Sequence, residues 1–524
     1  MLPSTAYGDS RLSLWLRVRR YAVPPSMIET ATGRRSAGDW AGACAAARFD
    51  VDLDLRSVAR AHGRETAARL RADLRGLAPD LLRWHMPRVA PDGLLRPGLT
   101  LTLARYERPG RAGPLHLVAR TPPSWADAGQ RIGLALWDPE QAVCGNHPHP
   151  HPNRRYRLDL HRHLWDARRA AGLRDRAGAC GPTPAQADPL GLVPPVRGCA
   201  VGRWAAEAAL LLAAEGHSTS AFAVRLGGGR RLALEPATDA DGGRRPASWS
   251  TPFAGRGDEG AGAVRALHPA APDGPGPALR VVTQPPPGGF STLPVLPDAA
   301  TWVLPDLELL RAGLLRPGQL HPLVAAALSP GWEPADPVRD DDPAAGARRV
   351  ECRGATHRIG LVDGALAPLD HDPAEIRREE LLAALGGPPL PCLRAVDEAH
   401  RRPHCLAGAR ERLDHGDVPG ALAVVEGLLG PAAVLRDGPL RDELAAAAER
   451  RIAYGLYRAG FTGTGHTGSG LLGTGRASVD RNTSAGRSTA DGRRTSDGRR
   501  TSDGRRTSGG RRPSRRETRP VTFF

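Results

Sequence analysis

The sequence predicts an α+β fold, in which mixed N-terminal and central domains with short antiparallel β-meanders precede a helical C-terminal segment and a disordered basic tail. Short, partly alternating apolar runs between Pro/Gly turns recur in two parts of the chain, as in β-meanders. Apolar residues at helical spacing surround both parts. The last part contains almost no apolar residues, so folding could not offset its loss of backbone entropy.

The first predicted domain, residues 10–175, mixes helices and strands. We expect helices over 39–47 and 56–77, because leucines recur at helical spacing in the second of them. The strands of the first meander are expected at 99–106, 115–120 and 131–137. A further helix is expected over 159–173, where apolar residues share one face. Residues 176–195 are rich in Pro and Gly and are expected to be a linker.

The central part begins with a helix and a hairpin, residues 196–235, whose strands flank a run of three glycines. Residues 236–278 are rich in Gly, Pro, Ala and Asp, so we expect a flexible linker or loop there. Residues 279–372 are expected to form a second mixed α+β region with a short strand at 301–304. The strands of its meander are expected at 350–352, 357–362 and 365–369. Asp363-Gly364 is the expected turn of this meander.

The C-terminal part of the body, residues 373–460, is expected to be helical. Asp372 can cap its first helix, with Pro373 at the first helical position and Glu375 at the third, in a capping-box-like arrangement. Residues 461–524 begin with a Gly/Thr-rich stretch and continue into arginine-rich repeats, so we expect this tail to be disordered.

Two short sequences resemble the turn of an α-hairpin repeat. Gly416-Asp417 precedes Gly420-Ala421, and Gly38-Asp39 precedes Gly42-Ala43 in the same way. A stable array needs about three repeats, so these two echoes do not predict a solenoid. They do indicate helical hairpins, which are common in proteins that bind other proteins.

The net charge of +16 lies mainly on the tail. Residues 476–524 contain 14 Arg and 5 acidic residues, whereas the remaining chain carries 58 Arg and 51 acidic residues. The charge therefore does not indicate a basic binding face on the body. No lysine occurs anywhere in the chain. This excludes the standard Walker A, protein-kinase and Schiff-base chemistries, because each of them needs a lysine amine.

The cysteines and the apolar runs predict a cytoplasmic protein. The chain has seven cysteines and no C-x-x-C pair, which favours reduced thiols over a framework of disulfides. The run Leu12–Leu16 is too short for the apolar core of a signal peptide. The most apolar run, Ala205–Ala214, is too short to span a bilayer and is interrupted by Glu207.

A group of Cys and His residues is the first candidate metal site. Its members lie within 20 positions and are Cys144, His147, His149, His151, His161 and His163. Zinc and nickel prefer such ligands, but prolines alternate with the first three histidines and favour polyproline II, in which these side chains diverge. His161 and His163 would share a face only on a strand. We retain Cys144, His161 and His163 as candidate ligands, and a rigid surface loop is the alternative.

A second candidate zinc site consists of Cys392, His400, His404 and Cys405. The two histidines have the i,i+4 spacing of ligands on one helix. Pro403 between them indicates a helix boundary, so ordinary residues at helix ends are the alternative interpretation.

Two other patterns have weaker support. The alternating acids Asp50, Asp52 and Asp54 could bind calcium, but the Gly and Glu positions of an EF-hand are missing. We therefore expect a half-exposed strand that leads into a helix. The Gly463-x-Gly465-x-x-Gly468 pattern matches a dinucleotide-binding loop by letter but follows no predicted strand. No nucleotide cofactor is expected.

The tail repeats offer two possible roles, polyanion binding and regulation by phosphorylation. Arginine pairs can bind phosphates, and serine after Arg-Arg-x resembles the site of basophilic kinases. The candidate residues are Arg493, Arg494, Ser496, Arg499, Arg500, Ser502, Arg505, Arg506, Ser508, Arg511, Arg512 and Ser514. A tandem expansion without a selected role is the alternative.

Three stretches resemble those of uncharacterised proteins from high-GC actinobacteria. They are Pro24-Pro25-Ser26-Met27-Ile28-Glu29-Thr30, Tyr156–Trp165 and Val362–Ala384. This resemblance implies no activity, so it assigns no functional residue.

The sequence therefore favours a non-enzymatic cytoplasmic interaction or regulatory protein with an unidentified protein partner. This interpretation rests on the α-hairpin pattern and on the lack of a G-x-S-x-G or H-E-x-x-H motif. The alternatives are a metal-dependent enzyme that uses the 144–163 group and a nucleic-acid-binding protein that uses the tail. No cofactor is predicted, and zinc is a possible ligand of the Cys/His groups.

Overall fold

A computed structural model of the chain describes residues 5–111, 113–141, 147–179, 193, 198–217, 220–227, 230–236, 279–282, 284, 289–331, 348–461 and 522–523. All of these residues belong to the unit of Met1–Thr462 and Pro520–Phe524. Most of the expected linkers, 176–195 and 236–278, and most of the expected tail, 461–524, lie outside the described residues. The observed fold class is α+β, with short antiparallel sheets and a helical C-terminal region.

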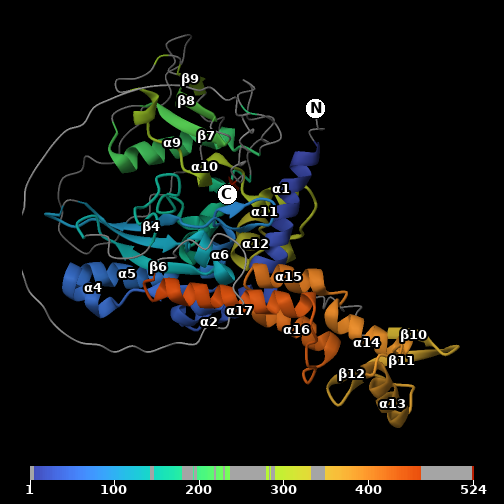
Figure 1. Cartoon of the computed structure of the whole chain (residues 1–524). Helices are drawn as coiled ribbons and strands as arrows, with labels where there is room; N and C mark the ends of the chain where they lie inside the picture. The colour runs from blue at the N-terminus through green and yellow to red at the C-terminus, as the bar shows by residue number, and fades with distance from the viewer. Residues whose placement is uncertain are drawn as a thin grey trace, which may run out of the picture. The chain divides into compact units, whose positions relative to one another are not determined.

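The first predicted meander forms most of a four-stranded sheet. Its strands are β4 (Thr100–Tyr106), β5 (Leu115–Arg120) and β6 (Ile132–Trp137), which pair antiparallel. The strand expected around the alternating acids is β1 (Phe49–Asp52), which pairs parallel to β6 with Phe49 opposite Ile132. The strand order is β1-β6-β5-β4, and Figure 1 shows β4 and β6 in this sheet.

The helices of the N-terminal part are α1 (Thr5–Arg17), the π-helix η1 (Val18–Ala22), α2 (Pro25–Ser36), α3 (Trp40–Ala46), α4 (Leu55–His62), α5 (Arg64–Gly76) and α6 (Pro79–Trp84). The single helix predicted over 56–77 is wrong, because Gly63 separates α4 from α5 with a φ of 89°. That left-handed backbone favours glycine and breaks the helix. Trp15, Leu70, Leu101 and Trp165 belong to the core that these helices share with the sheet. The short strands β2 (Arg88–Val89), β3 (Leu94–Leu95) and β13 (Thr522–Phe523) form a separate small sheet.

The helix predicted over 159–173 is also wrong. The chain there forms two 3₁₀ turns, η4 (Arg162–Leu164) and η5 (Ala167–Gly172), before the short helix α7 (Leu173–Arg176). Other partners take up the backbone groups that a helix would use. The carbonyl oxygen of Trp165 accepts a hydrogen bond from the N–H of Ala78, and the Trp165 indole donates to the carbonyl of Leu158. Tertiary hydrogen bonds therefore override the helical pattern of this segment.

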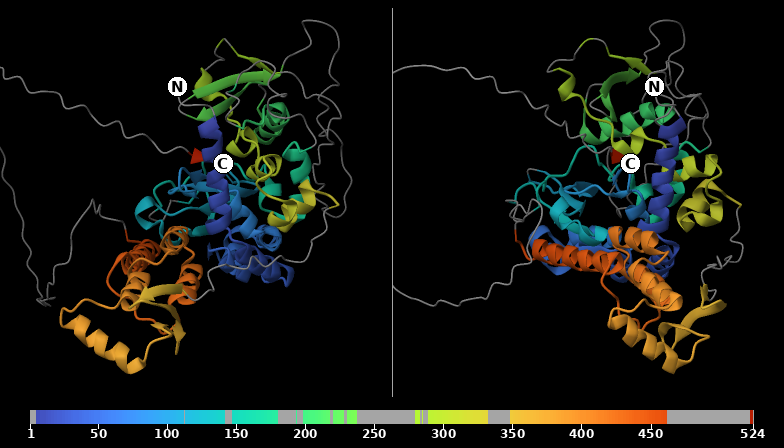
Figure 2. Two further views of the ribbon diagram at one scale, coloured as in Figure 1. Left: turned by 90° about the vertical axis from the view of Figure 1, so that its right-hand side faces the viewer. Right: turned by 45° about the vertical axis from the view of Figure 1, so that its right-hand side comes forward.

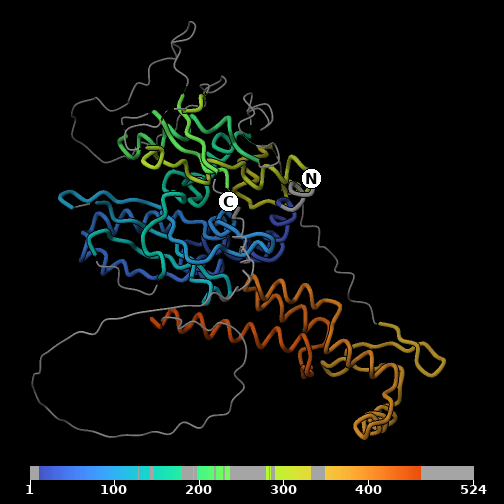
Figure 3. Tube along the Cα trace, turned by 45° about the horizontal axis from the view of Figure 1, so that its top comes forward, coloured from blue at the N-terminus to red at the C-terminus, as the bar shows by residue number. Residues whose placement is uncertain are grey.

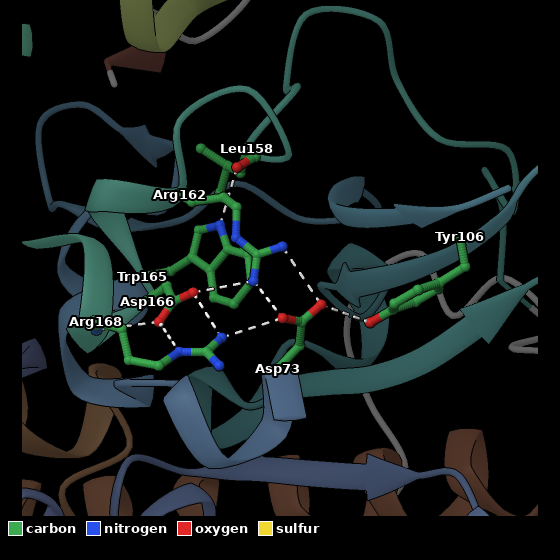
Figure 4. A network of polar contacts seen from close by, with 7 residues as sticks. All are labelled: Asp73, Tyr106, Leu158, Arg162, Trp165, Asp166 and Arg168. Atoms are coloured by element: carbon green, nitrogen blue, oxygen red, sulfur yellow. Dashed lines mark hydrogen bonds and ion pairs between the residues drawn. The ribbon is translucent and has the colours of Figure 1, made fainter. Parts of the chain in front are cut away.

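A polar network joins the same segment to α5 and β4 (Figure 4). The carboxylate of Asp73 accepts hydrogen bonds from the Tyr106 hydroxyl at 3.0 Å and from the guanidinium groups of Arg162 and Arg168. Asp166 accepts from both arginines as well. Two carboxylates thus balance two guanidinium groups, so the network is a structural tie with matched charge.

The central region contains α9 (Val201–Glu215) and a three-stranded antiparallel sheet of β7 (Phe222–Gly227), β8 (Arg230–Pro236) and β9 (Leu279–Val281). It continues with α10 (Asp298–Thr301), α11 (Pro305–Arg311) and α12 (Pro322–Leu328). The strand predicted at 301–304 is wrong: helix α10 ends there and only one isolated bridge, Cys199 to Trp302, follows. The carbonyl of Thr301 instead accepts from the backbone of Ala200 and the indole of Trp204.

The second predicted meander is confirmed. It consists of β10 (Arg348–Cys352), β11 (Ala355–Val362) and β12 (Ala365–Pro368), which pair antiparallel. Asp363 and Gly364 have φ angles of 49° and 77°, as the expected tight turn requires. Helices α13 (Pro373–Ala384) and α14 (Pro391–Arg401) follow, and both begin with proline at the first helical position. Figure 2 shows these strands and helices close together, in yellow and orange.

The expected helical C-terminal part continues with α15 (Leu406–Asp414), α16 (Val418–Leu429) and α17 (Pro439–Arg458), which lie side by side in Figure 3. The two glycine–aspartate sequences have the same local structure. Gly38 and Gly416 both have a φ of 79°, and the following Asp39 and Asp417 cap α3 and α16 through their carboxylates. The sequence echo therefore marks two helical hairpins of one kind, α2–α3 and α15–α16.

The C-terminal helices pack against the first sheet through polar pairs. Arg48 donates to the carbonyl of His415 at 2.6 Å and to the Asp417 carboxylate at 3.1 Å. Arg458 forms an ion pair with Asp52. Among the described residues, no helix combines the length and the apolar character needed to cross a membrane.

Candidate metal centre

Three elements of the second meander region bring a cysteine or histidine to one point. Cys352 ends β10, His371 precedes the N-cap of α13, and Cys392 lies in the first turn of α14. One ligand atom from each residue lies within 4.8 Å of the others. Two sulfur atoms and one imidazole nitrogen could therefore bind one metal ion.

The three side chains are buried. Cys352 and Cys392 are 1% and 0% exposed, and the His371 side chain is 3% exposed. Leu390 forms one buried apolar cluster with the two cysteines, and Val350 packs against this cluster. Water has little access to this point, so an ion bound there would exchange its hydration shell for protein ligands.

The histidine of this centre has an unsatisfied ring nitrogen. His371 Nε2 is buried and has no hydrogen-bond partner, while Nδ1 lies 3.5 Å from the Glu375 carboxylate. A carboxylate beside the other nitrogen is the usual second-shell partner of a metal-binding histidine. Glu375 is held in turn by Arg353 at 2.5 Å. It therefore does not complete the expected capping box, although Asp372 does cap α13.

Cys392 is a thiol at neutral pH when no metal is bound. Burial, followed by the hydrogen bond with Cys352, raises the pKa of Cys392 to about 11. A divalent cation would displace the proton, because a thiolate is the ligand form of cysteine. Two thiolates and an imidazole suit zinc, whereas magnesium and calcium prefer oxygen ligands.

The first candidate group of the sequence lies elsewhere. Cys144 lies outside the described residues. The rings of His161 and His163 are 5.9 Å apart between centroids. His161 has an acceptor near each nitrogen, the carbonyl of Arg157 at 3.0 Å and the Glu207 carboxylate at 3.1 Å. Burial lowers the pKa of His163 well below its ordinary value, so this ring is neutral at pH 7.

His147, in the proline-rich part of the first candidate group, forms hydrogen bonds with both of its ring nitrogens. His147 Nε2 donates to the carbonyl of Thr121 at 2.9 Å, and its Nδ1 accepts from the backbone of His149 at 3.2 Å. Both nitrogens of His147 are therefore engaged within the protein.

The second candidate group contributes one residue to the centre. Cys392 belongs to it, whereas His400, His404 and Cys405 are not in the group of three that converges. The helix boundary expected at Pro403 is present, because α14 ends at Arg401 and α15 begins at Leu406.

The alternating acids have structural partners. Asp50 accepts hydrogen bonds from Arg131 and from the Tyr454 hydroxyl. Asp52 pairs with Arg458, and Asp54 caps α4. These contacts agree with the expected half-exposed strand that leads into a helix.

Sequence reasoning missed Cys352 and His371. No short ligand pair marks them, because each of the three residues comes from a different element. Three features of the sequence could have indicated the centre. Cys352 ends a predicted strand, His371 precedes a predicted N-cap, and Cys392 is a candidate ligand.

The tail candidates, from Arg493 to Ser514, lie outside the described residues. Comparison of the chain with protein-family models, with curated protein sequences and with solved structures gives no match.

Proposed function

We propose that this chain is a non-enzymatic interaction protein of the cytoplasm, in which a zinc ion holds the segment 348–401 together. The observation that carries the proposal is the convergence of three buried ligands beside α13, a helix that buries none of its own residues. The ion would be structural, and the protein partner would bind the surface that the segment and its neighbouring helices present.

The core of this segment is too small to stabilise α13. The helix buries none of its residues. The apolar cluster beside it has three buried members, Cys352, Leu390 and Cys392, two of which are the proposed ligands, and Ile376 is the one residue of α13 that packs against it, partly buried. An isolated helix shorter than about 12–15 residues is marginal in water. Zinc binding supplies about 10–16 kcal/mol to the folding of small zinc-finger peptides, which would be ample here.

Exposed apolar side chains on α13 support an interaction role. Leu381, Leu382 and Leu385, at the end of this helix, are 65%, 55% and 85% exposed. Leucines grouped on a surface often mark a site for another protein. The hairpins α2–α3 and α15–α16 also belong to a kind of structure common in binding proteins.

Metal analysis of the purified full chain tests whether the proposed site binds zinc. We expect about one zinc per chain in the wild type and loss of zinc in Cys392→Ser, since a structural site needs its ligands. Cys405→Ser is the matched control and should keep the ion. A wild-type chain that is folded and free of metal would contradict the proposal.

The interaction role has its own test. The wild type and Cys392→Ser are used to capture proteins from native cytoplasm at high salt, where tail contacts with polyanions are screened. The proposal predicts a partner that binds the wild type and not the variant. A partner set that is identical for both chains would count against this segment as the binding module.

The arginine-rich tail supports a second, accessory proposal. Its 14 arginines against 5 acidic residues favour a salt-sensitive contact with a polyanion. Removal of residues 476–524 should abolish nucleic-acid binding that falls steeply with salt. Binding that survives the removal would assign it to the body instead.

A further inference from the structure

We propose that His357 is the fourth ligand of the metal centre, which makes it a closed Cys₂His₂ zinc site. This inference rests on the proposed function and goes beyond it, because it fixes the coordination of the ion. A site with three protein ligands keeps one position for water or substrate, as in zinc enzymes, whereas four protein ligands leave none.

The strand register places His357 on the same side of the sheet as Cys352. In the pairing of β10 with β11, Cys352 lies opposite Ala355 and Val350 lies opposite His357. Residues two apart on a strand, and residues directly opposite each other, share a face. Cys352 and Ile359 on this face are both buried. His357 therefore belongs to the inner face that also carries the first cysteine.

The two histidines are in contact. The rings of His357 and His371 are 4.1 Å apart between centroids and tilted by 46°. Two buried ring nitrogens, Nδ1 of His357 and Nε2 of His371, have no hydrogen-bond partner. A buried polar group without a partner is costly, and a shared ion would satisfy both nitrogens at once.

His357 does not belong to the group whose ligand atoms lie within 4.8 Å of one another. Its ring must therefore turn about the side-chain torsions to complete the site. The side chain is only partly buried, so the ring has room to turn on its solvent side. The backbone would not have to move, since the pairing with β10 already fixes its position.

A polar clamp holds the two histidines side by side. Arg358, next to His357, donates from its backbone N–H to the Asp370 carboxylate at 2.7 Å and from its guanidinium at 2.8 Å. The N–H of Leu369 donates to the carbonyl of Arg358 at 2.8 Å. The clamp thus joins the residue after one histidine to the residue before the other.

The four ligands come from separate parts of the segment. Cys352 comes from the end of β10, His357 from β11, His371 from the loop just before the N-cap of α13 and Cys392 from the first turn of α14. One ion would link all of these parts. Two cysteines and two histidines are a common ligand set of structural zinc sites, so the proposed ion is zinc. Four protein ligands leave no position for a water molecule, so the site would not catalyse hydrolysis.

Cobalt substitution in the full chain tests the fourth ligand. Co²⁺ bound to two thiolates and two imidazoles gives the strong visible absorption bands of a tetrahedral complex. If one coordination position is open, added azide can bind there and change these bands. We expect tetrahedral bands that azide does not change in the wild type and in the control His404→Ala. In His357→Ala we expect binding at least about tenfold weaker, with bands that azide does change.

The outcomes separate this inference from the proposed function. If the wild type and His357→Ala bind Co²⁺ with equal affinity and azide-insensitive bands, His357 is not a ligand and only the further inference fails. Bands of the wild type that respond to azide would overturn it as well. If the wild type binds no Co²⁺ at all, the proposed metal centre itself fails.

Discussion

Glu375 lies 3.5 Å from Nδ1 of His371, which leaves Nε2 of that ring as the nitrogen available for an ion. A glutamate at this position orients the imidazole and increases its basicity. Glu375→Gln should therefore weaken zinc binding by about tenfold or more without removing it. Competition with a chromophoric chelator measures the change. Glu449→Gln on α17 is a control of the same chemistry and should leave the affinity unchanged.

Acid should release the ion. The pKa of the metal-free Cys392 thiol is raised to about 11, so zinc must displace a proton from it at every pH below that value. Apparent affinity should then fall by at least about tenfold per pH unit as the pH decreases from 9 to 6. Titration of the full chain against a chelator at several pH values gives this slope. An affinity independent of pH would mean that no thiol proton is displaced.

The Arg358–Asp370 clamp should matter for the metal more than for the fold. The hydrogen bond and charge of Arg358 lower the pKa of Asp370 to about 2. Because this folded-state pKa is depressed, the clamp contributes at pH values above the ordinary aspartate range and is lost as the pH falls towards 2. Asp370→Asn should reduce zinc affinity at pH 7, while Asp437→Asn, which removes an exposed carboxylate paired with Arg441, should not.

Gly76 allows the polar network of Figure 4 to approach α5. A Cβ atom at this position would lie 2.6 Å from both the Arg168 guanidinium carbon and an oxygen of Asp166. We expect Gly76→Ala to lower the free energy of unfolding by about 1–3 kcal/mol in urea. Gly427→Ala is the matched control in α16, where nothing lies within 4 Å of the added atom. It should stabilise the chain by up to about 1 kcal/mol.

The N-cap of α16 should be more important than that of α3. Asp417 accepts from Gly420 N–H and also pairs with Arg48 and Arg412. Its replacement by Ala should cost about 2 kcal/mol or more, since it removes a cap together with the carboxylate that pairs with the guanidinium groups of Arg48 and Arg412. Asp39 caps α3 with a side chain that is 40% exposed and pairs only with the exposed Arg34 among the described residues, so Asp39→Ala should have a smaller effect. Equal effects in urea unfolding would show that the Arg48 contact adds nothing.

The secondary structure can be predicted from the sequence where short-range residue patterns determine it. Both meanders follow from alternation between Pro/Gly turns, and Asp363-Gly364 forms the turn expected of that pair. The helix expected over 159–173 is absent because Trp165 and Ala78, far apart in the chain, exchange a hydrogen bond that no local pattern records.

The metal centre also depends on tertiary packing, which local sequence patterns do not record. The sequence predicts Cys392 as a ligand, but the spacing along the chain points to His400 and His404 as the other ligands. Its observed companions, Cys352 and His371, come from a strand end and a helix start. Only the packing of those elements brings them within 4.8 Å, so spacing along the sequence could not reveal them.

Whether zinc holds the segment 348–401 together can be measured by hydrogen–deuterium exchange of α13 in the full chain, with zinc and after treatment with a chelator. We expect the amides of residues 374–384 to be protected with zinc and to exchange rapidly once it is removed, because this helix buries none of its residues. Amides of the first sheet should not respond. Protection of α13 that is the same in both states would show that the ion does not hold the segment together.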